Sequence, residues 1–188
     1  TEFLLQAGSE AQKKNWLPRI AAGQAIGCFA FAEGVGAMTP KAIKLAASGG
    51  RLTGSKVPVL DGDVADFAIV AARTGTGSDE RSISLFLVDL TSPGVTRHAV
   101  DTIDPTRSQA RLEFANVAAE PLGAPGAGWQ ILSDVYNRAA ILIAFEQVGG
   151  ADRALEMGRD YALERLAFGR PIGSFQAIKH MLADMYVS

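Results

Sequence analysis

The chain has 188 residues, with 18 Lys plus Arg against 20 Asp plus Glu and a net charge of −2, so no nucleic-acid partner is expected. Hydrophobic residues make up 48% and charged residues 20%, a composition typical of a soluble, cytoplasmic globular protein rather than a disordered one. Cys28 is the only cysteine, which excludes an intrachain disulfide and a cysteine metal cluster, and charges interrupt every apolar stretch before the ~20 residues of a membrane span.

Residues 1–22 are predicted to be helical. Ser9 and Gln12 have the spacing of a capping box, in which two side chains satisfy free backbone N–H groups at a helix start. Apolar residues follow at helical spacing from Trp16, and Pro18 predicts a kink. Gly23 is expected to end this helix.

Short strand-like runs separated by turn residues follow, from about residue 25 to residue 118. Their spacing of roughly 8–12 residues, without a helical segment between them, predicts an antiparallel sandwich or barrel. Residues 75–79 are expected to form an exposed hairpin loop. The predicted runs are 26–32, 57–60, 67–72, 82–90, 94–100 and 110–117.

A connector rich in Pro and Gly at 121–128 leads into one long helix, predicted from Trp129 to Leu166. Such a helix spans on the order of 50 Å and usually packs in a bundle with partners of similar length. A second helix is predicted from Ser174 to the end, with Ile178, Met181 and Leu182 on one face. The fold class is therefore α+β, and we expect the chain to be part of a longer protein because its last helix lacks a cap.

The segment between these two helices favours an anion site. Arg165 and Arg170 flank its turn, and Ser174 is expected to cap the second helix. Guanidinium groups beside a helix N-terminus suit a phosphate or pyrophosphate. Phe168 and Phe175 can pack against a planar ring, while Gln176 offers a donor and an acceptor. The alternative is that Arg165 pairs with Glu164 or Asp160 and that both phenylalanines lie in the core.

The same segment, Tyr161 to Asp184, resembles the signature of the acyl-CoA dehydrogenase family. The resemblance extends over nearly the whole chain, because 8–13 and 16–18 are similar to the end of that family's N-terminal helical domain. It implies three parts: residues 1–23 from that domain, 24–120 as the middle β-domain, and 121–188 as the first part of a C-terminal four-helix domain. The matching residues are Arg165, Phe168-Gly169, Pro171-Ile172, Phe175-Gln176 and Leu182-Ala183-Asp184-Met185.

The resemblance implies a flavoprotein that removes two hydrogens from Cα and Cβ of an acyl-CoA thioester. It implies FAD as cofactor, tetramers built from dimers, and an electron-transfer flavoprotein as electron acceptor. Arg165, Phe168 and Gln176 would contact FAD bound mainly by the neighbouring subunit, and Phe175 and Ile172 are assigned to the same cofactor site. No metal site is expected.

The sequence departs from the family pattern at two flavin-facing motifs. Where the family has Thr-Glu-Pro and then Gly-Ser-Asp, this chain has Ala32 and Met38 at the two hydroxyl positions. Where the family has Trp-Ile-Thr-Asn, residues 58–61 read Pro-Val-Leu-Asp. Either the backbone holds the flavin with different side chains around it, or this subunit's own flavin pocket is eroded. Both interpretations stay open.

The catalytic base is not identified. Removal of the α-proton requires a carboxylate, and most family members supply a glutamate beyond the point where this chain ends. The other family position, near the start of the long helix, is occupied by Ala139 and Ala140. Glu33 and Glu146 are expected to have structural roles, and a proton-transfer role is not expected for His180.

Two functions follow from these observations. The first is an acyl-CoA dehydrogenase of fatty-acid or steroid side-chain β-oxidation, acting as a homotetramer. The second is a non-catalytic subunit of an α2β2 heterotetramer that completes the FAD site of a related partner subunit. A flavin-free scaffold is a third, weaker hypothesis, because the signature is intact.

Overall fold

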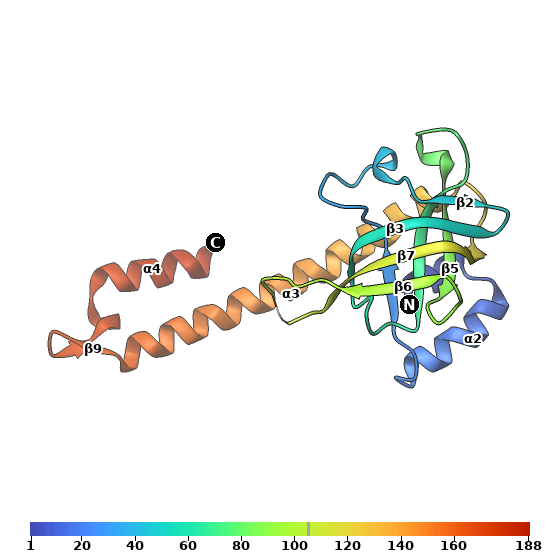
Figure 1. The fold of residues 1–188 in the computed structure, drawn as a ribbon. Helices are drawn as coiled ribbons and strands as arrows, with labels where there is room; N and C mark the ends of the chain where they lie inside the picture. Colours follow the sequence, from blue (N-terminus) through green and yellow to red (C-terminus); the bar gives the residue numbers. More distant parts are fainter. Residues whose placement is uncertain (105) are drawn as a thin grey trace. The chain divides into compact units, whose positions relative to one another are not determined.

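The computed structural model describes residues 1–104 and 106–188, which divide into two compact units, Thr1–Val135 and Tyr136–Ser188. The first unit holds two N-terminal helices, an eight-stranded sheet and the start of a long helix; the second holds the rest of that helix, a small hairpin and a final helix (Figure 1). The division into three family domains stays a prediction. The elements are α1 (Glu2–Ala7), α2 (Glu10–Ala21), β1 (Gly27–Ala30), η1 (Pro40–Ala42), β2 (Ala46–Ser48), β3 (Arg51–Leu60), β4 (Phe67–Arg73), η2 (Glu80–Ser82), β5 (Ile83–Asp89), β6 (Val95–Ala99), β7 (Gln109–Ala118), β8 (Glu120–Leu122), α3 (Gly128–Glu164), β9 (Leu166–Ala167), β10 (Arg170–Pro171), η3 (Ile172–Ser174) and α4 (Gln176–Val187).

The N-terminal helical segment consists of two helices rather than one. The chain is extended at Gly8, where a Cβ atom would lie 2.5 Å from the carbonyl oxygen of Leu4. The predicted capping box then starts α2: Ser9 Oγ accepts from the backbone N–H of Gln12 at 3.2 Å, and Gln12 Oε1 accepts from the N–H of Ser9 at 3.0 Å. Helix α2 continues through Pro18 and ends before Gly23, whose φ is +69°.

Replacing Ser9 by alanine is expected to lower the free energy of unfolding by about 1 kcal/mol, because the N–H of Gln12 loses its acceptor. Urea denaturation of the two proteins measures this difference. Ser78→Ala in an exposed loop is the matched control and should change stability by less than about 0.5 kcal/mol. Equal stabilities of the Ser9 variant and the wild type would show that the cap contributes nothing.

The sheet is mixed rather than wholly antiparallel. Its strand order is β6-β7-β3-β2-β4-β5-β8, with β1 paired to β4, and Figure 1 shows β3, β7 and β6 side by side. Most pairs are antiparallel, as predicted, but β1 and β2 both pair with β4 in parallel. A parallel pair requires a long connection. Here residues 31–66, which include β2 and β3, provide that connection between β1 and β4 without a crossover helix.

Strand β4 forms the centre of the core because both of its faces are covered. Ala68 and Val70 lie in one apolar cluster, whereas Phe67 and Ile69 lie in the other. The second cluster includes Trp16 of α2 and Leu132 of α3, so these helices cover that face of the sheet. Burial on both faces explains why this strand is a continuous apolar run instead of an alternating one.

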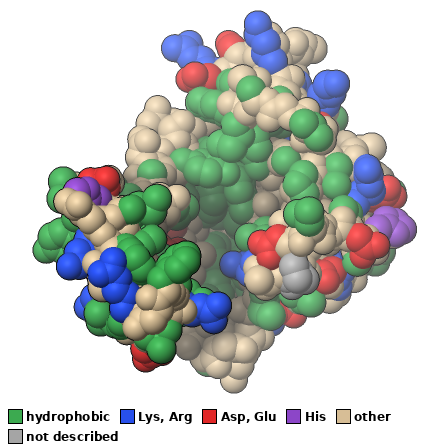
Figure 2. Space-filling model, turned by 90° about the vertical axis from the view of Figure 1, so that its left-hand side faces the viewer, with side chains coloured by type: hydrophobic (Ala, Val, Ile, Leu, Met, Phe, Trp, Pro, Cys, Tyr) green, Lys and Arg blue, Asp and Glu red, His purple; other side chains and the backbone are tan. Residues whose placement is uncertain are grey.

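Helix α3 extends over 37 residues, which confirms the predicted long helix. Its start belongs to the first unit, where Leu132 is fully buried. In the second unit many large apolar side chains of α3 and α4 are exposed, and Figure 2 shows large groups of hydrophobic side chains uncovered on the face that it presents. These exposed residues include Ile141, Leu142, Ile143, Phe145, Val148, Met157, Tyr161, Leu163, Met181, Met185, Tyr186 and Val187. Among the described residues no helix is long and apolar enough to cross a membrane.

Candidate functional site

The turn after α3 is a short hairpin that presents Phe168. Strands β9 and β10 pair in antiparallel fashion, with Arg170 opposite Ala167. The two residues between them, Phe168 and Gly169, both have positive φ, +52° and +77°. Positive φ at both central positions is what a tight two-residue hairpin requires. As a result Phe168 is 94% exposed. The alternative prediction, in which this phenylalanine lies in the core, does not hold in the structure.

Two aromatic rings and a guanidinium group lie together beside this hairpin. The rings of Phe168 and Phe175 meet edge to face, with their centroids 6.1 Å apart and an interplanar angle of 83°. Arg170 lies over the ring of Phe175, with Cζ 4.1 Å from the ring centroid. In the second unit, two aromatic rings therefore lie together beside the positive charge of Arg170.

Arg165 lies at the end of α3 with an exposed side chain. Of the two alternative partners, Glu164 and Asp160, neither pairs with it among the described residues; the carboxylate of Asp160 accepts from Arg159 at 2.7 Å instead. Within the described part of the chain, no hydrogen bond or ion pair holds the guanidinium group of Arg165. The cation is therefore available to a ligand.

The start of α4 differs from the prediction. Ser174 does not cap this helix: it belongs to η3, and its hydroxyl donates to the carbonyl oxygen of Pro171 at 2.7 Å. Phe175 is the N-cap residue and provides no side-chain acceptor, so the first N–H groups of α4 lack a side-chain partner. Gln176, the first residue of α4, is exposed, and Ile172 is half-buried. Four of the five predicted site residues thus lie between the hairpin and the start of α4, with Arg165 just before the hairpin.

The first unit contains the other segment that sequence reasoning singled out, the loop between Glu33 and Lys44. Neither Ala32 nor Met38 offers a hydroxyl group, and Thr39 is exposed. Glu33 has the expected structural role: Oε2 accepts from the N–H of Lys44 and Oε1 from the N–H of Leu45, both at 2.9 Å.

Lys56 is the partner of Glu33 that the sequence analysis missed. Its Nζ donates to Glu33 Oε1 at 2.7 Å and to the carbonyl oxygen of Phe31 at 2.9 Å, and its side chain is fully buried. Burial lowers the pKa of Lys56 to about 8, although the hydrogen bond and the charge of Glu33 act in the opposite direction. One signal in the sequence could have identified Lys56 as a buried residue. It lies four residues after the buried Leu52 in β3, so both side chains are expected on the inward side of the strand.

Arg73 at the end of β4 joins two loops of the first unit. Its guanidinium group donates to the carbonyl oxygens of Ile43 and Pro40, at 2.9 and 2.6 Å, and to Ser82 Oγ at 2.7 Å. It also donates to the carbonyl oxygen of Gly77. One side chain therefore fixes the loop before β2 against the hairpin loop between β4 and β5.

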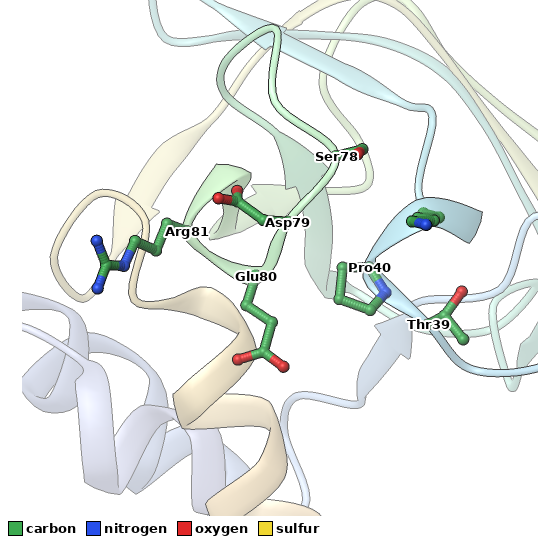
Figure 3. A pocket seen from close by; sticks show the side chains of 7 residues that line it. Thr39, Pro40, Ser78, Asp79, Glu80 and Arg81 are labelled. Atoms are coloured by element: carbon green, nitrogen blue, oxygen red, sulfur yellow. The ribbon is translucent and has the colours of Figure 1, made fainter.

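A hollow of about 590 Å³ lies between these two loops. Figure 3 shows Ser78 to Arg81 of the hairpin loop along one part of it and Thr39 and Pro40 along another. Lys41 completes the lining. Both acidic and basic side chains border the hollow, so its chemistry favours neither an anion nor a cation.

The remaining candidates lie outside these sites. Glu146 of α3 and His180 of α4 are both exposed in this chain. In the described ranges no group of three His, Cys, Asp or Glu side chains is placed to hold a metal ion.

Comparison with known proteins places this arrangement among characterised folds. The family model for the acyl-CoA dehydrogenase C-terminal domain matches residues 126–188. An acyl-CoA dehydrogenase of Bacillus subtilis (strain 168) is 34% identical over 201 residues, covering 98% of this chain and 51% of that protein. Acyl-CoA dehydrogenase IpdE2 of Mycobacterium tuberculosis is 42% identical over 130 residues, covering 69% of this chain and 34% of the relative.

A solved structure extends the likeness to three dimensions. A glutaryl-CoA dehydrogenase from Mycobacterium smegmatis in complex with FADH2 superposes with a TM-score of 0.85 and 31% identity, covering 98% of this chain and 49% of that one. The chain thus spans about half the length of that structure and of the Bacillus relative.

Proposed function

Since this chain belongs to the acyl-CoA dehydrogenase family, we propose that it takes part in the FAD-dependent α,β-dehydrogenation of an acyl-CoA thioester. Within that reaction the chain would supply part of the FAD site, and a carboxylate outside it would remove the α-proton. An assembly of four subunits, an electron-transfer flavoprotein as acceptor and a cytoplasmic location remain predictions that accompany this proposal.

The observation that carries the proposal is the guanidinium group of Arg165, unpaired among the described residues, in the same short segment as the exposed ring of Phe168 and the uncapped start of α4. A pyrophosphate suits the guanidinium group and the free N–H groups of α4, whose dipole also favours negative charge. Phe168 offers an exposed apolar face to a planar ring, and Gln176 offers amide hydrogen bonds. These residues fit the phosphate and ring portions of FAD. When bound, FAD supplies the hydride acceptor for the substrate.

Replacing Arg165 by alanine is expected to weaken FAD binding by about 10- to 100-fold, because a charge-assisted hydrogen bond contributes roughly 1.5–3 kcal/mol. Titration of the apoprotein with FAD, followed by flavin fluorescence, measures the change. Arg153→Ala is the matched control, since Arg153 pairs with Glu156 on the surface of α3 and lies outside the proposed site. FAD affinities that agree between Arg165→Ala and wild type would remove Arg165 from the site.

A second candidate is the non-catalytic subunit of an α2β2 assembly. The absence of hydroxyl groups at Ala32 and Met38 favours it, since the chain would then lend Arg165 and Phe168 to a partner's FAD while its own pocket is degenerate. The FAD content of the full-length protein, measured by absorbance, separates the two. One FAD per chain in the protein expressed alone contradicts this second candidate, whereas FAD that appears only with a related partner subunit supports it.

A further inference from the structure

The loop of residues 34–43 is closed at its base by a single carboxylate. Glu33 precedes the loop, and the two backbone N–H groups that its carboxylate accepts belong to Lys44 and Leu45, which follow the loop. Each carboxylate oxygen takes one of these donors at 2.9 Å. The side chain of Glu33 therefore joins the two ends of the loop.

Lys56 ties this closure to the sheet. Its Nζ donates to Glu33 Oε1. The backbone on either side of Glu33 is hydrogen-bonded to Val57 in β3. The N–H of Gly34 donates to the carbonyl oxygen of Val57 at 2.7 Å, and the N–H of Val57 donates to the carbonyl oxygen of Ala32 at 2.8 Å. The side chain of Lys56 is 0% exposed and that of Glu33 12%. Because both charges are withdrawn from water, loss of either partner leaves the other uncompensated.

The part of the loop beyond this closure has few contacts of its own. Gly34 and Gly36 have φ of +111° and +152°, and a Cβ atom at either position would meet nothing within 4 Å. The side chains of Val35 and Met38 are exposed. Further along the loop, the guanidinium group of Arg73 anchors it at the carbonyl oxygens of Pro40 and Ile43. Residues 34–39 are therefore held at their two ends and free between them.

We infer that Glu33 and Lys56 act as one clamp, a pair of positioning residues that fixes the conformation of loop 34–43 and thereby presents this loop to the flavin. The inference rests on the proposed function for the identity of the ligand. Closure of the loop by Glu33 is a property of this chain and is tested without any ligand.

Trypsin provides the test, because Lys41 and Lys44 lie in or next to the loop and both are exposed. We expect Glu33→Gln to raise the rate of cleavage after these lysines by about tenfold or more, since an amide cannot balance the buried charge of Lys56. Glu113→Gln, which makes the same change at an exposed strand position, is the control and should leave the rate unchanged.

The double variant Glu33→Gln/Lys56→Met separates loop closure from general stability. It buries no unpaired charge, so we expect its thermal midpoint to return towards that of the wild type. Cleavage after Lys41 and Lys44 should remain fast, because one amide oxygen replaces the two carboxylate oxygens that accept from Lys44 and Leu45. Slow, wild-type cleavage in both variants would overturn the clamp.

The flavin gives a second readout. In the full-length protein we expect Glu33→Gln to lower FAD affinity by about tenfold and to shift the visible absorption band of the FAD that remains bound. Fast cleavage with unchanged FAD affinity and spectrum would overturn the role of the clamp in presenting the loop. If the wild type binds no FAD with any partner, the proposed function fails, while the cleavage rates still decide whether Glu33 closes the loop.

Discussion

Replacing Gly128 by alanine is expected to lower the free energy of unfolding of the first unit by about 1–3 kcal/mol, because the added methyl group has no space. Its Cβ atom would lie 2.7 Å from Cα of Ser84 and 2.8 Å from the carbonyl oxygen of Ile83. Both are backbone atoms of the central sheet, so they cannot turn aside as a side chain can. The first residue of α3 therefore has to shift away from β5.

A shift at Gly128 would also disturb its neighbours, because the chain is fixed to the same region just before the helix. The N–H of Gly126 donates to Ser84 Oγ at 2.9 Å, and Leu132 lies one turn further on in the core. Urea denaturation measures the loss. Gly75→Ala is the matched control, since a Cβ atom there meets nothing within 4 Å. If the two alanine variants are equally stable, contact between Gly128 and β5 does not limit the packing of α3.

The cost of burying the charge of Lys56 is expected to disappear as the pH rises from about 8 towards 10.5. Folding lowers the pKa of this lysine, so in that window the unfolded chain binds a proton that the folded chain has released. The free energy of unfolding then increases with pH, by up to about 1.4 kcal/mol for each pH unit. Below pH 8 both states are protonated and this contribution is constant.

Comparison with Lys56→Met isolates this contribution from the other titrating groups. Urea denaturation of both proteins at pH 7, 8, 9 and 10 measures their free energies of unfolding. The value for the wild type, relative to that for the variant, should increase by on the order of a few kcal/mol across the series. Glu33 is the charged residue that acts on Lys56 in the folded chain. A constant difference between the two proteins would mean that Lys56 titrates in the folded chain as it does in water.

Local signals explain what the sequence predicted well. The capping box at Ser9 depends on two side chains three residues apart, and the length of α3 follows from its apolar period and from the Gly-rich segment before it. The hairpin of β4 and β5 was predictable because both strands are long and a polar loop joins them.

Long-range contacts explain what the sequence did not predict. The parallel pairing of β1 with β4 joins residues about 40 positions apart, and no local pattern encodes it. Strands β2 and β8 have three residues each, too few to show an alternation. In the candidate site, the exposure of Phe168 follows from its backbone in the turn, and the N-cap of α4 is Phe175 rather than the predicted Ser174.

Arg73 has a consequence for how this fold tolerates insertions and deletions. Surface loops usually vary in length among related proteins because little depends on their path. Here the β4–β5 loop supplies the carbonyl oxygen of Gly77 and the hydroxyl of Ser82 to the guanidinium group that also holds Pro40 and Ile43. A residue added or removed between Gly77 and Ser82 would misplace one of these acceptors. Length changes in this loop are therefore tolerated only outside that short stretch, or together with a compensating change near Pro40.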